Sequence, residues 1–562
     1  MVFRRVEGGI SQWPGSGGGP YGRVMPELDI TGGPVFRRLA AALPAACVLA
    51  LAAVPPAALS SSPSPSPFRA PSGSQLGAPP VSPGTESLLP ASRIAAGAGR
   101  EIDPAAVDRF VNAYREATGL PGVAVAVTRG AKVVHVAGYG RTASGEPVTG
   151  RTPMAVASLS KSFTALAVMQ LVEEGRVGLD APVREALPEF TMADPRAARI
   201  TVRQLLDQTS GMATSAFRER SLPQPRSLRE AVARLRGARL AADPGTRWSY
   251  HNTNFQVAAR LVEVVAGVPF ADRLRTHVFG PLGMRDSRTI DTERDLPPTA
   301  RGHLHLLGVP IALAEPHGFG NGSGGVISSA GDMARWMIMQ AGEGTGPGGV
   351  RVVSAAGVAE MRTPSRIKRS YALGWALGTT GSGAPVVEHD GDLSTATARQ
   401  TLLLRSGHGI VVMANTGTAY DDSGAIADAL VAMAEGREPE PPPSPSPFLL
   451  VDAVFALAAA LTLALAGRGL VRSRRWSARR AGRPGWRTAA RLLPYAAPGV
   501  LCLTITDVFR VLSRGGDATW AHVAYLYFSF VIWLLLAAVA CALLLLARLR
   551  HLVLAGAGQA SR

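Results

Sequence analysis

The segment at residues 157–166, ASLSKSFTAL, places Ser158 three residues before Lys161. Residues spaced by three on a helix share one face, so the two side chains can meet. A neutral lysine amine can take the proton of a serine hydroxyl and turn that serine into a nucleophile. The pattern S-x-x-K also arises by chance, and Ser158 could serve only as a helix N-cap.

The scarcity of lysine favours the catalytic interpretation. The chain has 58 basic residues, of which only Lys132, Lys161 and Lys368 are lysines. Residues 162–172 are apolar on almost all sides, which is typical of a buried helix. Burying a charge is costly, and lysine can be shifted toward its neutral form whereas arginine cannot. The pattern indicates a position that needs an amine and not merely a charge.

A second segment, RWSYHNTNF, contains Tyr250 and Asn252. A phenol beside an ammonium group can have its pKa lowered and act as a general acid and base. Asn252 lies two residues further on, points the same way on an extended segment, and could bind a substrate amide. The alternative is a half-buried tyrosine at the start of a helix that Asn252 or Thr253 caps.

A third segment, VVEHDGDL, carries His389 and Gly391 on an expected late strand. A glycine in a strand permits close approach of another backbone, so a substrate could lie against this strand edge. The alternative interpretation is a strand that ends at a turn.

The elements expected around these segments form one large domain. Residues 104–119 have helical spacing, and residues 122–140 read as two strands around the turn at Arg129-Gly130. Capping-box patterns begin helices at Thr201 and Ser227. Strand-like segments return late in the domain, before a last helix at about 425–436: 371–378, 384–391, 397–406 and 409–417. We expect an α/β or α+β fold, in which strands from both ends form one sheet packed by helices, with a helical insert.

In order and spacing, these S-x-x-K, Y-x-N and H-x-G motifs resemble the serine β-lactamase and penicillin-binding protein superfamily, in its class C-like branch. Residues 200–212 (ITVRQLLDQTSGM) and 320–337 (GNGSGGVISSAGDMARWM) are similar to that branch as well. The resemblance covers about 103–436. It implies an antiparallel sheet flanked by helices, beside a mostly helical lobe, with the active site between them.

The resemblance also implies roles for individual residues. Ser158 would be the acylated nucleophile, and Lys161 and Tyr250 would share the proton transfers. Asn252 would bind the substrate amide. The backbone N–H of Asp392 would join that of Ser158 in an oxyanion hole.

The third motif departs from class C β-lactamases, which have Lys-Thr-Gly where this chain has His389-Asp390-Gly391. His-x-Gly looks more like the D-amino-acid peptidases and esterases of the superfamily, with His389 and Gly391 in the substrate-binding strand. Asp390 and Asp392 should also disfavour a substrate carboxylate. We therefore expect β-lactams to act as inhibitors or poor substrates.

A metal hydrolase is the competing class of enzyme. His303, His305 and His317 could suggest ligands, but no Asp or Glu follows them at metal-site spacing. We interpret them as scattered surface histidines and expect neither a metal nor another cofactor.

The net charge of +17 and the pI near 10.7 suggest a nucleic-acid partner, but the charge is unevenly distributed. Residues 101–435 hold 35 basic and 32 acidic residues, whereas residues 447–562 hold 14 and 3. The basic excess therefore lies among apolar segments near the C-terminus. We expect no nucleic acid partner and instead a contact with membrane lipid.

Three apolar segments near the C-terminus approach the length that crosses a bilayer: 448–466, 492–512 and 522–547. The loop at 467–491 carries nine arginines and no acid, so the positive-inside rule predicts that it is cytoplasmic. The domain before the first span would then lie outside the cytoplasm. Residues 513–521 would form a short outer loop.

These features divide the chain into six parts: an N-terminal extension with a signal peptide or anchor (1–60), a Pro/Ser/Gly-rich linker (61–102), the hydrolase-like domain (103–436), a Pro-rich stalk (437–447), three membrane helices with a cytoplasmic Arg-rich loop (448–547) and a cytoplasmic tail (548–562). We expect a multi-pass cell-membrane protein with an extracellular catalytic domain. Its expected activity is that of a serine hydrolase acting on peptide, amide or ester bonds. Peptidoglycan stem peptides, small esters and D-amino-acid amides all fit. The alternative is a penicillin-binding sensor that is acylated without turnover.

Overall fold

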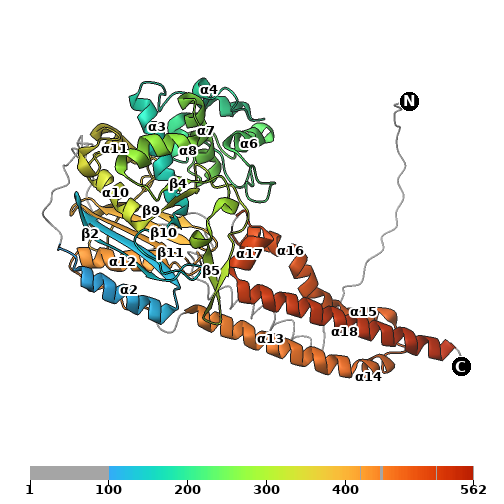
Figure 1. The fold of residues 1–562 in the computed structure, drawn as a ribbon. Helices are drawn as coiled ribbons and strands as arrows, with labels where there is room; N and C mark the ends of the chain where they lie inside the picture. Colours follow the sequence, from blue (N-terminus) through green and yellow to red (C-terminus); the bar gives the residue numbers. More distant parts are fainter. Residues whose placement is uncertain (1–99, 418, 444–446, 514–515, 561–562) are drawn as a thin grey trace, which may run out of the picture. The chain divides into compact units, whose positions relative to one another are not determined.

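The computed structural model describes residues 100–417, 419–443, 447–513 and 516–560, all within one compact unit, Pro55–Arg562. The predicted signal peptide or anchor and most of the predicted linker lie outside the described residues. A six-stranded sheet forms the centre of the domain (Figure 1). Its strand order is β2 (Lys132–Gly140), β1 (Gly122–Arg129), β11 (His408–Ala414), β10 (Thr397–Leu403), β9 (Pro385–Asp392) and β8 (Ala376–Thr379).

The sheet confirms the prediction that strands from both ends of the domain pair with each other. The early strand β1 pairs antiparallel with the late strand β11, and the β9, β10 and β11 strands continue in antiparallel order. The predicted strand at 371–378 is shorter than expected, because only Ala376–Thr379 pairs with β9. The second half of β9, from His389 onward, is therefore not covered by β8.

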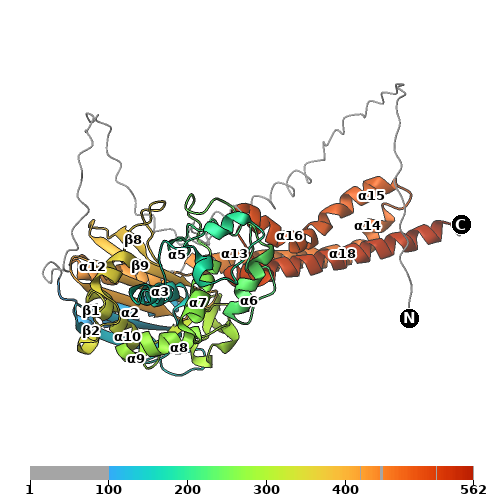
Figure 2. The same cartoon turned by 90° about the horizontal axis from the view of Figure 1, so that it is seen from above.

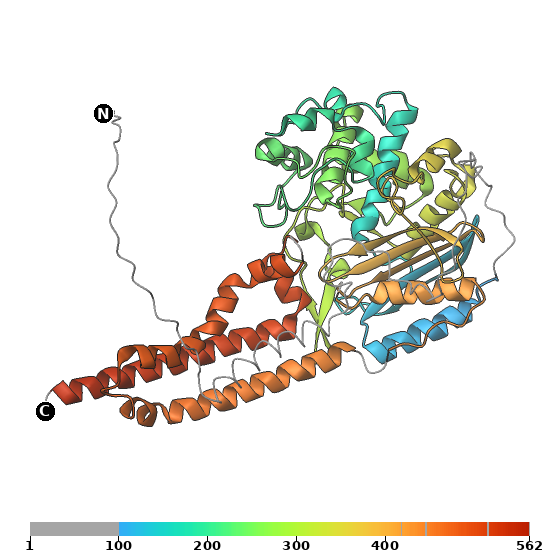
Figure 3. The same cartoon turned by 180° about the vertical axis from the view of Figure 1, so that it is seen from behind.

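The two faces of the sheet follow from the alternation of side chains in β1. Its valines Val123, Val125 and Val127 pack in one apolar cluster with α2 (Pro104–Thr118) and α12 (Asp422–Ala434). The smaller Ala124 and Ala126 point the other way, toward α10 (Ala330–Ala341). Side chains alternate between faces along a strand, so one strand serves two layers. Figures 1 and 3 show α2 and α12 covering one face together.

The helical lobe surrounds α3 (Ser160–Glu173), of which Ser160 to Leu171 are all buried (Figure 2). This confirms the expected buried helix. The expected capping box at Thr201 is present, with Thr201 and Gln204 bonding each other's backbone N–H groups.

The other helices of the domain are α4 (Val183–Ala186), α5 (Val202–Leu206), α6 (Leu228–Ala233), α7 (Asn252–Ala266), α8 (Phe270–Leu274), α9 (Gly280–Leu282) and α11 (Ala355–Met361). Two small sheets complete it: β3 (Met154–Ala155), β7 (Val326–Ser328) and β4 (Arg288–Thr289), and the hairpin β5 (Gly302–Leu306) and β6 (Val309–Leu313).

Three C-terminal helical segments are long and apolar enough to cross a membrane: Phe448–Val471, Gly485–Leu512 and Phe528–Ala557. The last was expected to begin at His522, but it begins later because Trp520–Leu526 forms a separate short helix, α17. The chain leaves helical geometry at Tyr527 and re-enters it in α18 (Phe528–Ala560). The remaining helices are α13 (Pro447–Val471), α14 (Ser473–Ala478), α15 (Gly485–Leu492) and α16 (Ala497–Leu512).

Candidate active site

Ser158 lies in a single 3-10 turn, Ala157–Leu159, directly before α3. The turn begins with Ala157 in the left-handed region (φ 48°), a conformation that a non-glycine residue adopts only when its surroundings impose it. Ser158 is half-buried, and two groups reach its Oγ. Lys161 Nζ and Tyr250 OH each donate a hydrogen bond to Ser158 Oγ over 2.9 Å. The structure thus brings together the three residues that the sequence motifs singled out.

Lys161 is completely buried, and burial lowers the pKa of its amine to about 7. Its Nζ also donates a hydrogen bond to the backbone carbonyl of Ser323, 2.8 Å away. That carbonyl belongs to the glycine-rich segment that resembles the superfamily. A Cβ on Gly322 would come within 2.7 Å of the Phe255 carbonyl oxygen, so the segment needs glycine to approach α7.

The pKa of the Tyr250 phenol is shifted in the opposite direction from the one that the sequence predicted. Burial raises its pKa above the ordinary value, and Asp392 and Glu219 add to that rise. The expected lowering by a neighbouring ammonium is wrong, because loss of water around the phenol outweighs the nearby charge. Lys161 Nζ lies 4.8 Å from the centre of the Tyr250 ring. Tyr250 is therefore protonated at neutral pH and can act as a proton donor.

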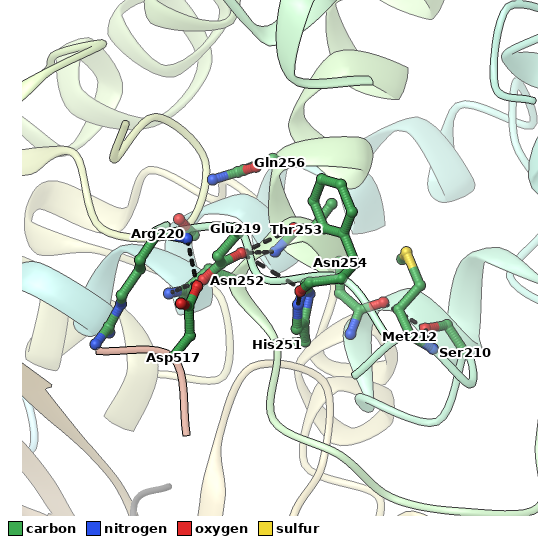
Figure 4. Close-up of polar contacts among 12 residues, drawn as sticks. Ser210, Met212, Glu219, Arg220, His251, Asn252, Thr253, Asn254, Gln256 and Asp517 are labelled. Atoms are coloured by element: carbon green, nitrogen blue, oxygen red, sulfur yellow. Dashed lines mark hydrogen bonds and ion pairs between the residues drawn. The ribbon is translucent and has the colours of Figure 1, made fainter. Parts of the chain in front are cut away.

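Residues of the segment at 200–212 are hydrogen-bonded to the start of α7, which begins two residues after Tyr250 in the chain. Gln208 adopts a left-handed conformation (φ 64°), and its side-chain oxygen accepts hydrogen bonds from the His251 N–H and from Asn254 Nδ2. Ser210 Oγ donates to Asn254 Oδ1 over 2.6 Å, and Figure 4 shows both residues, Asn254 on α7 and Ser210 beside it. The two segments are far apart in sequence, and these buried polar contacts fix them to each other.

Asn252 is the first residue of α7, and its amide is already engaged (Figure 4). Asn252 Nδ2 donates to Glu219 Oε1 over 2.8 Å, while the Thr253 N–H and hydroxyl donate to Glu219 Oε2. Burial tends to raise the pKa of Glu219, but His251, Arg220 and these hydrogen bonds hold it below its usual value. A carboxylate at a helix N-terminus is favourable, and Glu219 supplies it from a loop.

His389 is 1% exposed, and its ring packs against Tyr250 and Tyr371, with ring centres 6.3 and 6.1 Å apart. Burial, together with the nearby Lys161, lowers the pKa of His389 to about 3, so the ring is neutral. Its Nδ1 lies 2.7 Å from the Asp390 carbonyl oxygen, and a neutral ring donates there. His389 thus lies behind Tyr250 as a packing partner.

Position 391 needs a glycine for a steric reason that the sequence did not reveal. A Cβ at this position would lie 2.3 Å from the Val156 carbonyl oxygen and 3.2 Å from the Ala157 Cβ. The glycine therefore lets β9 approach the turn that carries Ser158. In the structure, the missing side chain makes room for the turn that carries Ser158, and the hypothesis that it also makes room for a substrate backbone stays a prediction.

Comparison with known proteins identifies the family, because residues 107–433 match the family model described as Beta-lactamase. The chain belongs to the beta-lactamase family. Penicillin-binding protein 4 of Amycolatopsis lactamdurans is 33% identical over 337 residues, which cover 56% of this chain and 85% of that protein. Esterase EstB of Burkholderia gladioli is 30% identical over 262 residues, which cover 40% of this chain and 67% of that protein.

Among solved structures, the octameric penicillin-binding protein homologue from Pyrococcus abyssi is similar with a TM-score of 0.52 and 25% identity. The match covers 63% of this chain and 82% of that one. The resemblance inferred from the motifs is thereby confirmed, as is the antiparallel sheet with flanking helices. The beta-lactamase-family domain has serine hydrolase homologues, a penicillin-binding protein and an esterase among them.

A cavity of about 220 Å³ opens beside Ser158 in this beta-lactamase-family domain. Ser158, Tyr250 and Asn252 line it, and β9 contributes Asp390 and Asp392. Arg399 Nε lies 3.3 Å from Asp390 Oδ1, which offsets part of that acidic charge. The wall also contains Glu219 and Arg220 from the loop before α6, together with residues of the C-terminal helices that are described below.

Of the three histidines considered as metal ligands, His317 is exposed as expected, whereas His303 and His305 are not the surface residues that the sequence suggested. His303 and His305 are 6% and 5% exposed, because they belong to β5, and His303 Nδ1 lies 3.1 Å from the Asn415 carbonyl oxygen. The ring of His305 packs on Tyr420. Among the residues that the structure describes, no group of three or more His, Cys, Asp or Glu side chains could hold a metal ion.

Sequence reasoning missed two contributors to the site. Glu219 lies in an irregular loop at 213–226, where no motif or periodicity marks it. The Ser323 carbonyl is a backbone group, so its residue type carries no signal. Both were detectable only once the chain was folded.

Proposed function

We propose that this chain is a membrane-anchored serine hydrolase that acts outside the cytoplasm through an acyl-enzyme on Ser158. The observation that carries the proposal is the placement of Lys161 Nζ and Tyr250 OH, each 2.9 Å from Ser158 Oγ beside a cavity. A nucleophile with a base within hydrogen-bond reach is the arrangement that acyl transfer requires. The penicillin-binding protein and esterase homologues support the same class.

Acylation begins with the proton of Ser158. A pKa of about 7 leaves a large share of the Lys161 amine neutral at neutral pH, so its lone pair can take that proton. Ser158 Oγ then bonds to the substrate carbonyl carbon, and negative charge moves to the carbonyl oxygen. We assign the backbone N–H groups of Ser158 and Asp392 to stabilise this oxyanion. The tight approach of Gly391 to the Ser158 turn supports the assignment.

The leaving group needs a proton as its bond to the carbonyl carbon breaks. Tyr250 supplies it, because burial keeps the phenol protonated, and Tyr250 regains a proton from the Lys161 ammonium. The products of this step are a neutral amine or alcohol and the Ser158 ester. Water then attacks the ester, gives its proton to the same pair of residues, and releases the acid and free Ser158.

The proposed substrates are D-amino-acid peptides, amides or esters. Asn252 is assigned to the substrate amide, with Glu219 holding its side chain in place. His389 is assigned to position Tyr250, and Gly391 to position the catalytic turn. Asp390 and Asp392 line the cavity and disfavour a carboxylate next to the scissile bond. Peptidoglycan stem peptides are the substrate class that the proposed location favours, and β-lactams are expected to act as inhibitors or poor substrates.

The proposed location is the outer face of the cell membrane, with three spans and a cytoplasmic Arg-rich loop. The three apolar helices and the nine arginines at 467–491 support it. The contact of Asp517 with Arg220 also supports it, because the short loop after the second span lies on the side of the catalytic domain. The hydrolase domain (103–436), the Pro-rich stalk (437–447) and the tail (548–562) keep their proposed boundaries.

Cysteine accessibility in intact cells tests this topology. A single cysteine at position 480 (Arg480→Cys) should resist a membrane-impermeant maleimide until the cells are opened, and Arg109→Cys should react at once. Both variants are made in a chain whose native cysteines are replaced. Labelling of Arg480→Cys from outside would overturn the proposed orientation.

Intact-mass labelling of the purified full-length chain tests the enzyme. A fluorophosphonate and a fluorescent penicillin should each add one adduct, at Ser158, and a panel of D-peptides and esters should then show steady turnover. A burst of acylation without turnover would favour the alternative, a penicillin-binding sensor. Absence of any adduct at Ser158 would contradict both the proposed serine hydrolase and the alternative sensor.

A further inference from the structure

The loop between the second and third apolar helices reaches the catalytic domain through Asp517. Asp517 is 9% exposed, and its Oδ2 accepts hydrogen bonds from the backbone N–H groups of Arg220 and Ser221, over 2.7 and 3.2 Å. The Ser221 hydroxyl donates to its other oxygen, Oδ1. Figure 4 shows the carboxylate of Asp517 beside Arg220. Hydrogen bonds to an ionised carboxylate are stronger than those between neutral groups.

The segment that Asp517 holds is the one that organises the start of α7. Glu219, the residue before Arg220, accepts the hydrogen bonds of Asn252 and Thr253. The loop at 219–221 is therefore held from two sides, by α7 on one and by Asp517 on the other. A continuous set of contacts leads from the membrane helices to Asn252.

The same helices also form part of the cavity wall. Phe509, Asp517, His522 and Leu526 line the cavity together with Ser158. Two other polar contacts join these helices to the domain. Tyr525 OH donates to the Ala314 carbonyl oxygen over 2.6 Å, and Asp452 Oδ2 accepts from the Leu307 N–H over 2.6 Å. The cavity is thus built from both the catalytic domain and the C-terminal helices.

We propose that Asp517 is a positioning residue of the active site, and that the C-terminal helices complete the part of the site that binds the substrate beyond its scissile carbonyl. The proposal rests on the proposed function. Asp517 fixes the loop at 219–221, Glu219 then orients the Asn252 amide, and the helices close the cavity beside it. A substrate that reaches Asn252 depends on this wall. A small ester that needs only Ser158, Lys161 and Tyr250 depends on it less.

Steady-state kinetics on the full-length chain in detergent tests the proposal. The two substrates are p-nitrophenyl acetate and a D-alanyl dipeptide amide. Asp517→Ala should raise the KM of the peptide at least tenfold more than the KM of the ester. Asp517→Asn should restore most of the affinity, because its amide oxygen can accept from both N–H groups while its Nδ2 donates to Ser221 Oγ. Equal changes of the two KM values, or no rescue by Asp517→Asn, would overturn the proposal.

Asp507→Ala is the matched control, since Asp507 lies on α16, just before the loop that carries Asp517, but pairs with Arg510 at 2.7 Å. It should leave both KM values within about twofold of the wild type. The comparison separates loss of the specific contact from a general effect of removing an acid from these helices.

Hydrogen exchange provides a readout that does not require activity. Asp517→Ala should speed the exchange of the Arg220 and Ser221 amides in the peptide 217–224, because both lose their acceptor, whereas Asp507→Ala should not. Unchanged exchange in Asp517→Ala would overturn the proposal whatever the kinetics show. Fluorophosphonate labelling of wild-type Ser158 tests the proposed function separately, so failure of one is distinguishable from failure of the other.

Discussion

Ser158 and Asn252 line the same cavity, but different forces hold them in place. Ser158 lies three residues from Lys161, in a turn that leads into a fully buried helix. Asn252 is held by Glu219, which is 33 residues away in the sequence. Glu219 in turn lies in a loop that is hydrogen-bonded to Asp517, which is 297 residues from Arg220 and 296 from Ser221. The half of the site that we propose performs the chemistry is thus part of the core, while the half that we propose binds substrate is assembled from loops.

This difference predicts that changes around Ser158 affect the rate of acylation, whereas changes around Asn252 affect substrate affinity. The part of the site around Ser158 and Lys161, called the core half below, has little freedom to relax, because protein interiors are closely packed. The part around Asn252 and Glu219, called the loop half, has polar contacts that can be broken one at a time. The predictions below test the core half, and the Asp517 variants test the loop half.

The largest expected effect is at the nucleophile. Ser158→Ala should abolish covalent labelling by penicillin and fluorophosphonate, because it removes the hydroxyl to which Lys161 Nζ and Tyr250 OH are hydrogen-bonded. Ser162→Ala is the matched control and should keep most of the labelling. Its hydroxyl donates to the Leu159 carbonyl oxygen and accepts from Gln400, away from Lys161. Ser160→Ala should also keep most of it, and a labelled peptide that maps to Ser160 would show the assignment to be wrong.

Lys161→Arg should lower the acylation rate of Ser158 at least about a hundredfold, equivalent to about 2.7 kcal/mol of barrier. Arginine cannot release its proton, so the base is lost even though the charge remains. Stopped-flow acylation measures the rate, and thermal melts should agree within a few degrees of the wild type. Lys132→Arg, at an exposed site paired with Glu101, is the control. Near-normal acylation by Lys161→Arg would mean that Lys161 is only a counter-charge.

Gly391→Ala should slow acylation by roughly ten- to a hundredfold with a smaller effect on KM. The added Cβ would lie 2.3 Å from the Val156 carbonyl oxygen, so the turn that carries Ser158 must shift. Misplacement of reacting groups by about 1 Å can cost about a hundredfold in rate. Gly378→Ala in β8 is the control, because its Cβ would meet its nearest neighbour at an ordinary 3.6 Å. Equal acylation rates in the two variants would contradict this role for Gly391.

The smallest expected effect is the dependence on pH. The pKa of about 7 for Lys161 means that the amine is mostly protonated below pH 7 and mostly neutral above it. The acylation rate should therefore rise about tenfold from pH 6 to its plateau above pH 8, since each unit below the pKa lowers the neutral fraction about tenfold. A pre-steady-state pH profile of the wild type checks this. A rate that falls as pH rises through 7 would exclude the neutral amine as the base.

The local elements of the domain were largely predictable from the sequence. The first two strands, the late strands and the last helix were predicted close to their positions, since alternation and turn residues act over a few neighbouring residues. The strand before the His389 motif was shorter than expected, because pairing with β9 and not the local pattern decided its length. The third apolar helix begins later in the chain than the predicted segment, because the hydropathy pattern does not show that the helix is interrupted at Tyr527.

For the site, the sequence by itself determined which residue types meet. Ser158 and Lys161 are three residues apart on one turn, and a run of apolar neighbours implied burial and a shifted lysine pKa. Only the tertiary structure decided the sign of the shift at Tyr250, because that shift depends on the water excluded by segments distant in sequence. Only the tertiary structure could place Glu219 beside Asn252 and Asp517 beside Arg220, since the side chains of distant loops meet through packing, which leaves no pattern in the neighbouring residues.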